Sequence, residues 1–514
     1  MTSARDNKRL FTVGHIFLSG ALLAGFLYVS ARTVKSDPYS YDEADYMFAV
    51  SRGARANWLD TTTLSLSQFI DNALTRGSDH KQRSALSKMI RSSDDALFYR
   101  HFHGPVLCFW LIGVCSFHNH EHWMRSSMLV FPATTGLLIY FGLLWLLPRS
   151  STGNIAALIG AVLFWGSYFV IASTEVAPHQ IFVTLVTAAL IAAAKARVES
   201  ACRWWYCAVI ISALAVATLE VAFVLVFVLL GSAWLERDRW HIDKRFVVTS
   251  ILAFVCMITV VWPAALLRLS FLKAYAFMAY LAVFRDAAWG NHSLLETWAL
   301  RFQKGSLELL LVPIALIALW KSRAPLTKGA PLFLTFGLIM LGITFGVNGD
   351  LPRYLLPFLP ALHIFVAIAI AAVLAAYTAK IRIIVVVLTC ALRLTDTVRV
   401  LSTRSQTADP RPAALLTEIR DFGLENRRLL VPQEDLPSLH YYFPKALLTG
   451  YLDPSVSPPE VDAILCTGFP VRITLLPVAS VTVERVCSSG APDLRRANKI
   501  EPGDLVHLSH AVGP

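Results

Sequence analysis

Long apolar segments separated by short polar turns fill about the first 400 residues of the chain, and most approach the ~20 residues that a helix needs to cross a bilayer. A backbone in lipid must satisfy its own hydrogen bonds, so each segment predicts a helix. In chain order the segments lie at 10–30, 104–117, 127–147, 154–173, 179–197, 204–219, 220–235, 246–267, 307–320, 331–347, 354–377 and 381–398. The pattern is typical of a polytopic α-helical membrane protein.

The positions of the basic residues predict how these segments are oriented. If all of them cross and the N-terminus is cytoplasmic, the basic loops 236–245 and 321–329 face outward, against the positive-inside rule. Segment 104–117 has only about 14 residues and opens with a Gly-Pro pair, which is typical of an interfacial helix. If it does not cross, the basic loops become cytoplasmic. The sequence then predicts about 11 spans, with long outer loops at about 31–126 and 268–306.

Two segments decide whether this orientation holds. Residues 204–235 must form two short helices that meet near Glu220, because one long helix would reverse the parity of every later loop. The N-terminal apolar stretch follows a basic start and is too long for the apolar core of a signal peptide. We therefore expect it to be a retained first span of a multi-pass protein in the cytoplasmic (inner) membrane, with the N-terminus in the cytoplasm.

The sequence changes character after residue 400. Residues 427–452 predict strand, helix and strand, and the runs VDAILCTG and VASVTVERVC predict further short strands. The chain is thus expected to consist of a transmembrane domain at 1–400 and a small extracytoplasmic α/β domain at 401–514. Cys466 and Cys487 are the two cysteines of this second part, and a disulfide between them would need an oxidising compartment.

Composition agrees with a membrane protein: 55% of the 514 residues are hydrophobic and 16% are charged. A formal net charge of +11 could indicate nucleic-acid binding. Much of the Lys and Arg lies in short loops between spans, however, where the positive-inside rule places it. The sequence therefore predicts no nucleic-acid partner, and the cysteines show no zinc-binding spacing.

Two polar stretches of the predicted outer face contain charged candidate residues. SYDEADYMFA, at 40–49, holds Asp42, Glu43 and Asp45, and its structural alternative is a solvated acidic first turn of a helix. In NGDLPRYLLPFLP, Arg353 is the sole Lys or Arg of the short outer turns and precedes Tyr354. A guanidinium matches phosphate geometry and suits a lipid phosphate at headgroup depth, whereas an Arg that merely snorkels is the structural alternative.

Two further outer stretches contain histidines. In YRHFHGPVLCFW, His101 and His103 precede the interfacial segment and are either metal ligands or, as is commoner, structural residues. In STEVAPHQIF, Glu175 and His179 are spaced i, i+4, and Pro178 suits the first turn of the next helix. Ionisable residues at a membrane interface are functional candidates, with a helix cap as the structural alternative.

In this order the four stretches resemble the GT-C superfamily of membrane glycosyltransferases, nearest to the protein O-mannosyltransferase and aminoarabinose (undecaprenyl-phosphate sugar) transferase type. Asp42-Glu43 matches the Asp-Glu motif of the first outer loop, HGPVLCFW matches the motif that opens the interfacial helix, and RYLLPFLP matches the late Arg-Tyr motif. The chain departs from the pattern before the interfacial helix, where His103-Gly104-Pro105 stands in place of the usual proline pair. Either Glu175 or His179 takes the place of the acidic residue expected in the second outer loop.

The resemblance implies a cell-envelope enzyme that transfers a sugar, with inversion, from a polyprenyl phosphate to a hydroxyl of a lipid, glycan or protein. Asp42 is the expected general base, with Glu43 in support. Arg353 and Tyr354 are expected at the donor phosphate, assisted by Arg268 and Lys273 of the second long outer loop. No cofactor is certain. Some GT-C enzymes use a divalent metal, for which Asp42, Glu175 and His179 are the candidate ligands, although their spacing does not require one.

Two other functions stay open at this point. A secondary transporter would place its acidic residues near the membrane midplane and usually shows internal repeats, neither of which the sequence displays. A catalytically inactive protein built on the same fold is the second alternative.

Overall fold

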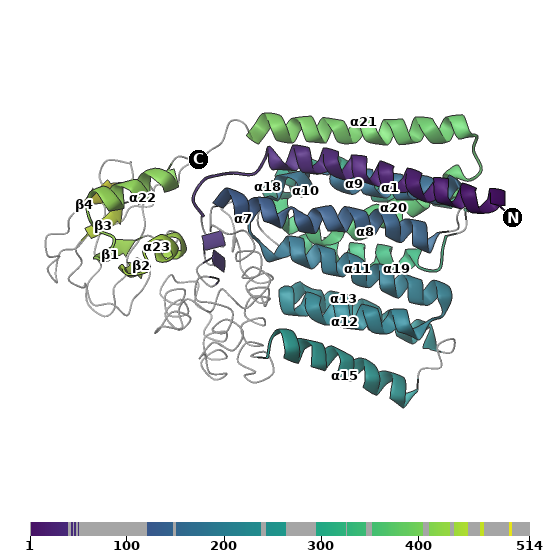
Figure 1. Cartoon of the computed structure of the whole chain (residues 1–514), viewed down its shortest axis with the longest axis horizontal. Helices are drawn as coiled ribbons and strands as arrows, with labels where there is room; N and C mark the ends of the chain where they lie inside the picture. Colours follow the sequence, from purple (N-terminus) through teal and green to yellow (C-terminus); the bar gives the residue numbers. More distant parts are fainter. Residues whose placement is uncertain are drawn as a thin grey trace.

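The structure, a computed structural model, shows a bundle of helices that run side by side, with a small sheet beyond one end of the bundle (Figure 1). It describes residues 2–39, 43–44, 46–47, 50, 121–147, 151–237, 243–263, 294–324, 326–345, 352–404, 411–431, 436–450, 463–466 and 493–495. The interfacial segment 104–117 and most of the two long outer loops lie outside these ranges. We call the end of the bundle that carries the sheet the sheet end; Ala31, Glu121, Pro178 and Pro352 lie there.

The helical part of the chain is mostly apolar helix with few capping side chains. Asp243 is one such cap, since its carboxylate accepts a hydrogen bond from the Phe246 amide, and Pro178 occupies the first turn of its helix. The helices are α1 (Thr2–Ala31), α7 (Glu121–Met128), α8 (Val130–Leu146), α9 (Ser151–Trp165), α10 (Tyr168–Ala172), α11 (Pro178–Glu199), α12 (Cys202–Thr218), α13 (Phe223–Leu235), α15 (Lys244–Val261), α18 (Leu294–Ser322), α19 (Ala330–Phe345), α20 (Leu359–Leu374) and α21 (Ala379–Arg404). Two 3₁₀ turns, η3 (Glu220–Ala222) and η4 (Pro352–Phe358), connect them.

The chain breaks at Glu220, as the orientation argument requires. α12 ends at Thr218, Leu219 is extended at φ −152° and ψ 134°, and the η3 turn leads into α13. The two helices lie side by side (Figure 1). Residues 204–235 are therefore divided into two helices, although the total number of spans stays a prediction.

The core of the bundle lies between α8, α9, α11 and α20. Tyr140, Phe164, Phe182 and Phe365 are among its fully buried side chains. Glycines allow the helices to approach closely: a Cβ at Gly160 would lie 2.7 Å from Leu143 and 2.9 Å from Ile139. α20 is buried along most of its length, so it occupies the middle of the bundle.

The outer helices expose apolar side chains, as expected for surfaces in lipid. Val247, Ile251 and Leu252 of α15 are examples. Five described helical stretches are long and apolar enough to cross a membrane: Gly14–Ala31, Glu121–Leu146, Pro178–Glu199, Lys244–Val261 and Arg353–Leu374. Shorter apolar helices lie between them. The fold is thus that of a mostly helical, multi-pass membrane protein, as predicted.

The C-terminal segment holds a small mixed sheet with two helices. Its elements are α22 (Arg411–Asp421), β1 (Arg428–Val431), α23 (Leu436–Tyr442), β2 (Leu447–Gly450), β3 (Ala463–Cys466) and β4 (Asp493–Arg495), with strand order β2-β1-β3-β4. β1 pairs in parallel with β2 and β3, and β3 pairs antiparallel with β4. The helix α23 makes the crossover between β1 and β2, which is the strand–helix–strand predicted for 427–452.

This C-terminal segment has its own small core, which includes Leu416, Ile419, Leu429 and Leu439. Gly423 ends α22 with φ +63°, a left-handed conformation that glycine adopts without strain. Cys466 ends β3, whereas Cys487 and the run VASVTVERVC lie outside the described residues. A bond between Cys466 and Cys487 therefore stays an open alternative, and the domain boundary at residue 400 stays a prediction.

Candidate active site

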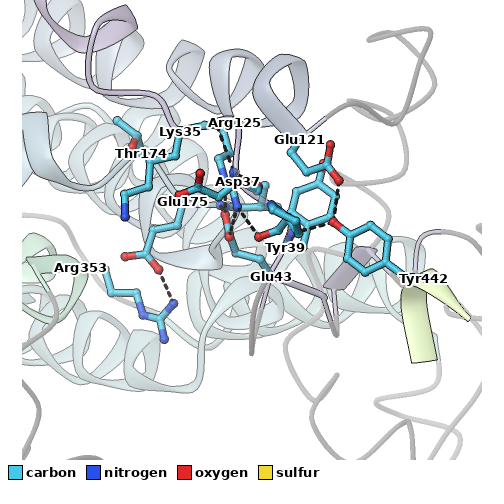
Figure 2. Close-up of polar contacts among 12 residues, drawn as sticks. Lys35, Asp37, Tyr39, Glu43, Glu121, Arg125, Thr174, Glu175, Arg353 and Tyr442 are labelled. Atoms are coloured by element: carbon cyan, nitrogen blue, oxygen red, sulfur yellow. Dashed lines mark hydrogen bonds and ion pairs between the residues drawn. The ribbon is translucent and has the colours of Figure 1, made fainter. Parts of the chain in front are cut away.

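Glu43 and Arg125 form a buried ion pair at the sheet end (Figure 2). Arg125 of α7 donates through Nε to Glu43 Oε1 at 2.9 Å and through Nη2 to Oε2 at 2.6 Å. The Arg125 and Glu43 side chains are 6% and 8% exposed, respectively. This bidentate geometry makes the guanidinium–carboxylate contact stronger than a single hydrogen bond would be. The pair joins the predicted first outer loop to the start of the α7–α8 helix pair.

Arg125 also holds the stretch that follows α1. Its Nη1 donates to the carbonyl oxygens of Lys35 at 3.0 Å and Asp37 at 2.7 Å. Its Cζ lies 5.2 Å from the centre of the Tyr39 ring, within the range of a cation–π contact. One buried guanidinium therefore holds both the stretch 35–39 and the Glu43 side chain.

Glu43 reaches a third part of the chain through its Oε1 atom. The backbone amide of Val176 donates to that atom at 2.8 Å. Residue 176 belongs to the turn 173–177 between α10 and α11. Gln180 holds the same turn from the other side, because its Nε2 donates to the carbonyl oxygens of Ser173 at 2.7 Å and Glu175 at 3.0 Å. The turn is thus clamped by two side chains.

The clamped turn directs Glu175 toward η4. Arg353 Nη1 donates to Glu175 Oε2 at 2.8 Å (Figure 2). The Arg353 side chain is 7% exposed, whereas the Glu175 side chain keeps 24% of its surface accessible. The guanidinium is therefore sheltered and its carboxylate partner is the more accessible member of the pair.

Two aromatic rings complete this cluster. The Arg353 Cζ lies 5.4 Å from the centre of the Tyr354 ring, and the His179 ring meets Tyr354 edge-on at 5.8 Å between centroids. Glu175, His179, Arg353 and Tyr354 therefore lie together, as the orientation argument predicts. Their juxtaposition gives a positive charge, a carboxylate and an imidazole within one small region at the sheet end.

The remaining candidates from the sequence divide into two groups. Glu43 is described: among the described residues its carboxylate accepts hydrogen bonds from Arg125 and from the Val176 amide, contacts that suit a residue supporting Asp42. The other candidates lie outside the described residues; they are Asp42, His101, His103, Arg268 and Lys273.

The described part of the chain does not assemble a metal site. No group of three His, Cys, Asp or Glu side chains lies close enough together among those residues to hold an ion. Of the three candidate ligands, Glu175 is paired with Arg353, His179 packs against Tyr354, and Asp42 lies outside the described residues. The roles proposed below are therefore those of the side chains themselves.

Sequence reasoning missed Arg125, although the sequence contained a signal for it. Arg125 lies in the predicted first outer loop just before a span, where a basic residue runs against the positive-inside rule. A basic residue at such a place indicates a specific structural or functional role, and the buried ion pair with Glu43 is that role. Gln180 carried no comparable signal, because its role depends on the conformation of the turn.

Comparisons with known proteins show what the fold of this chain is similar to. Residues 103–263 match the family described as dolichyl-phosphate-mannose-protein mannosyltransferase. The crystal structure of ArnT from Cupriavidus metallidurans bound to undecaprenyl phosphate superposes with a TM-score of 0.53 at 15% identity, over 85% of this chain and 86% of ArnT. The apo oligosaccharyltransferase of Archaeoglobus fulgidus superposes with a TM-score of 0.51 at 11% identity, over 88% of this chain and 69% of that one. No curated protein sequence matches the chain.

The chain has the GT-C fold. The predicted resemblance to the GT-C superfamily of membrane glycosyltransferases is thereby confirmed, and at such low identities what the structures share is the fold. The family match covers Arg125, Glu175 and His179 of this GT-C chain. Glu43 and Arg353 lie outside the match; a buried ion pair joins Glu43 to Arg125, and a partly buried one joins Arg353 to Glu175.

Proposed function

We propose that the protein is an integral-membrane glycosyltransferase. It moves a sugar from a polyprenyl-phosphate donor to an acceptor hydroxyl at the extracytoplasmic face of the cytoplasmic membrane. The observation that carries the proposal is the sheltered Arg353 guanidinium, held at the sheet end against the partly accessible Glu175 carboxylate. The GT-C fold supports it and disfavours a secondary transporter. ArnT, which shares this fold, was crystallised bound to undecaprenyl phosphate, and this supports a lipid-phosphate donor here.

Arg353 is suited to the departing phosphate. In the transfer, the acceptor oxygen bonds to the anomeric carbon as the bond from that carbon to the phosphate oxygen breaks. Negative charge then grows on the phosphate, and a guanidinium already fixed in a sheltered place stabilises it without reorganising. The Tyr354 ring beside Arg353 limits the directions in which the guanidinium can turn. Arg268 and Lys273 are proposed to add positive charge from the second long outer loop.

Asp42 is the proposed general base, and it receives the proton of the acceptor hydroxyl. A base must lie within hydrogen-bond reach of that proton, so its backbone has to be held firmly. Asp42 directly precedes Glu43, whose carboxylate is fixed by Arg125 and by the Val176 amide. We propose that this fixed Glu43 carboxylate helps to orient Asp42, which adjoins it in the chain.

Glu175 is proposed to hold Arg353 in place until the donor arrives. Its carboxylate accepts a hydrogen bond from Arg353 Nη1, where we propose that a donor phosphate oxygen takes its place, and it is the more accessible member of the pair. His179 is proposed to face the same region through its contact with Tyr354.

Mass spectrometry of a deletion strain tests the proposal. Lipids and envelope glycans of the strain are compared with those of its parent, and we expect one sugar substituent to be lost and the matching polyprenyl-phosphate sugar to accumulate. The purified protein is then given that lipid and should release free polyprenyl phosphate as the acceptor gains the sugar. The enzyme proposal would be refuted if the glycans were unchanged and the purified protein released no polyprenyl phosphate from any extracted donor lipid. A catalytically inactive protein with the GT-C fold would then be the remaining alternative.

A further inference from the structure

The Tyr442 hydroxyl connects the C-terminal segment to the predicted first outer loop. Tyr442 is the last residue of α23, and its oxygen accepts a hydrogen bond from the Tyr39 amide at 2.7 Å. The same hydroxyl donates to Glu121 Oε1 at 2.5 Å (Figure 2). Tyr39 and Glu121 precede Tyr442 by 403 and 321 positions, respectively, so the contact joins distant parts of the chain.

Packing around Tyr442 agrees with a docking role. Its ring packs against the small core of the C-terminal segment, which contains Leu439 and Phe443. It also packs against a second buried cluster at the sheet end, which contains Tyr39 and Met124. Among the described residues, Tyr442 is the side chain that packs against both clusters. Tyr441 supports it through an edge-on contact with Tyr39 at 5.4 Å.

The hydroxyl is kept in the protonated form that this arrangement needs. Burial raises the pKa of Tyr442 well above its usual value, and the hydrogen bond to Glu121 raises it further. A neutral hydroxyl donates to the Glu121 carboxylate and accepts from the Tyr39 amide at the same time. The contact therefore persists at any physiological pH.

The Tyr442 contact and the Glu43–Arg125 clamp hold the same two segments. Tyr39 belongs to the stretch whose carbonyl oxygens bind Arg125, and Glu121 lies one helical turn before Arg125 on α7. The Tyr39 ring itself lies against the Arg125 guanidinium. The Tyr442 hydroxyl of the C-terminal segment therefore joins the Tyr39 stretch to α7, and Arg125 of the bundle joins the same two segments.

We propose that Tyr442 is a positioning residue, through which the C-terminal segment holds the stretch 35–39, which leads to the proposed base, in the geometry that sugar transfer requires. The catalytic consequence of this inference rests on the proposed function. The contact of Tyr442 with Tyr39 and Glu121 is independent of that function. Loss of the hydroxyl frees the Tyr39 amide and loosens the segment that leads to the proposed base. It leaves Arg353, on the other side of the clamped turn, in place for the lipid phosphate.

The test compares Tyr442→Phe with Tyr441→Phe in the full-length protein in detergent. Both variants lose one tyrosine hydroxyl from α23, and for Tyr441 the structure gives ring contacts and no hydroxyl hydrogen bond among the described residues. Hydrogen–deuterium exchange followed by mass spectrometry reports on the Tyr39 amide. We expect exchange in peptides spanning residue 39 to be at least about tenfold faster in Tyr442→Phe and unchanged in Tyr441→Phe.

Turnover and binding supply the second readout. In Tyr442→Phe we expect kcat to fall at least about tenfold, while the Kd for undecaprenyl phosphate stays within about twofold of the wild type. A general loss of structure would weaken both. The inference is overturned if Tyr442→Phe matches Tyr441→Phe in amide exchange, or if exchange rises without any fall in kcat. A wild-type protein that transfers no sugar would refute the proposed function, and the exchange comparison would still decide the docking.

Discussion

The Glu43 carboxylate lies against the Arg125 guanidinium with Oε1–Nε and Oε2–Nη2 distances of 2.9 and 2.6 Å, and both side chains are buried. Arg125→Ala leaves that carboxylate buried without its partner. We expect a loss of about 3–5 kcal/mol of stability, because an unpaired buried charge is far more costly than the pair. The unfolding midpoint of the purified protein in detergent measures this loss.

Two further variants make the interpretation specific. The double variant Arg125→Ala with Glu43→Ala should lose less stability than the sum of the single variants, since it removes the buried charge as well. Arg203→Ala breaks an exposed pair with Glu199, at 3.7 Å, and should change stability by less than about 1 kcal/mol. Additive losses at Glu43 and Arg125 would show that the two side chains do not depend on each other.

Asp42→Asn should reduce sugar transfer by about 10²–10⁴-fold, the usual contribution of a general base. Expression and membrane insertion should stay as in the wild type, because the substitution removes one charge from a polar stretch. Asp45→Asn is the matched control, with the same change in the same stretch, and it should keep most of the activity. Equal losses in both variants, or full activity in Asp42→Asn, would remove Asp42 from the mechanism.

Glu175→Gln should tighten the binding of undecaprenyl phosphate by about threefold to tenfold, or roughly 1 kcal/mol. The Gln side chain no longer neutralises Arg353, so the guanidinium is freer to bind the lipid phosphate. Glu199→Gln, at the far end of the same helix α11, is the control and should leave the affinity unchanged. Weaker binding in Glu175→Gln would mean that the carboxylate serves the donor site instead of competing with it.

Hydropathy and the positions of basic residues were sufficient to predict which candidate residues lie at the same end of the bundle. Counting basic loops placed Glu175, His179 and Arg353 at the same end of the bundle, and they are in contact there, directly or through Tyr354. The division of 204–235 at Glu220 followed from the same count. Each of these inferences depends on hydropathy and charge, which can be read position by position.

Roles that depend on packing between distant segments could not be read in this way. The resemblance to the Asp-Glu motif put Glu43 in support of Asp42, but no sequence pattern indicated that Arg125 is its buried partner. The contacts of Tyr442 join positions separated by most of the chain, and a tyrosine at the end of a short helix gives no sign of them. Such pairings depend on the tertiary structure.

The central claim is that Arg353 binds the phosphate of a polyprenyl-phosphate sugar donor. The most direct measurement compares Arg353→Ala with Arg197→Ala, which breaks a similar, partly buried pair with Glu236, at 2.9 Å, in another part of the bundle. Binding of undecaprenyl phosphate to the purified proteins is measured by isothermal titration calorimetry. We predict that Arg353→Ala raises the Kd about 10–100-fold, as expected for loss of a charged hydrogen bond, while Arg197→Ala leaves it unchanged. Equal affinities in Arg353→Ala and the wild type would contradict the claim.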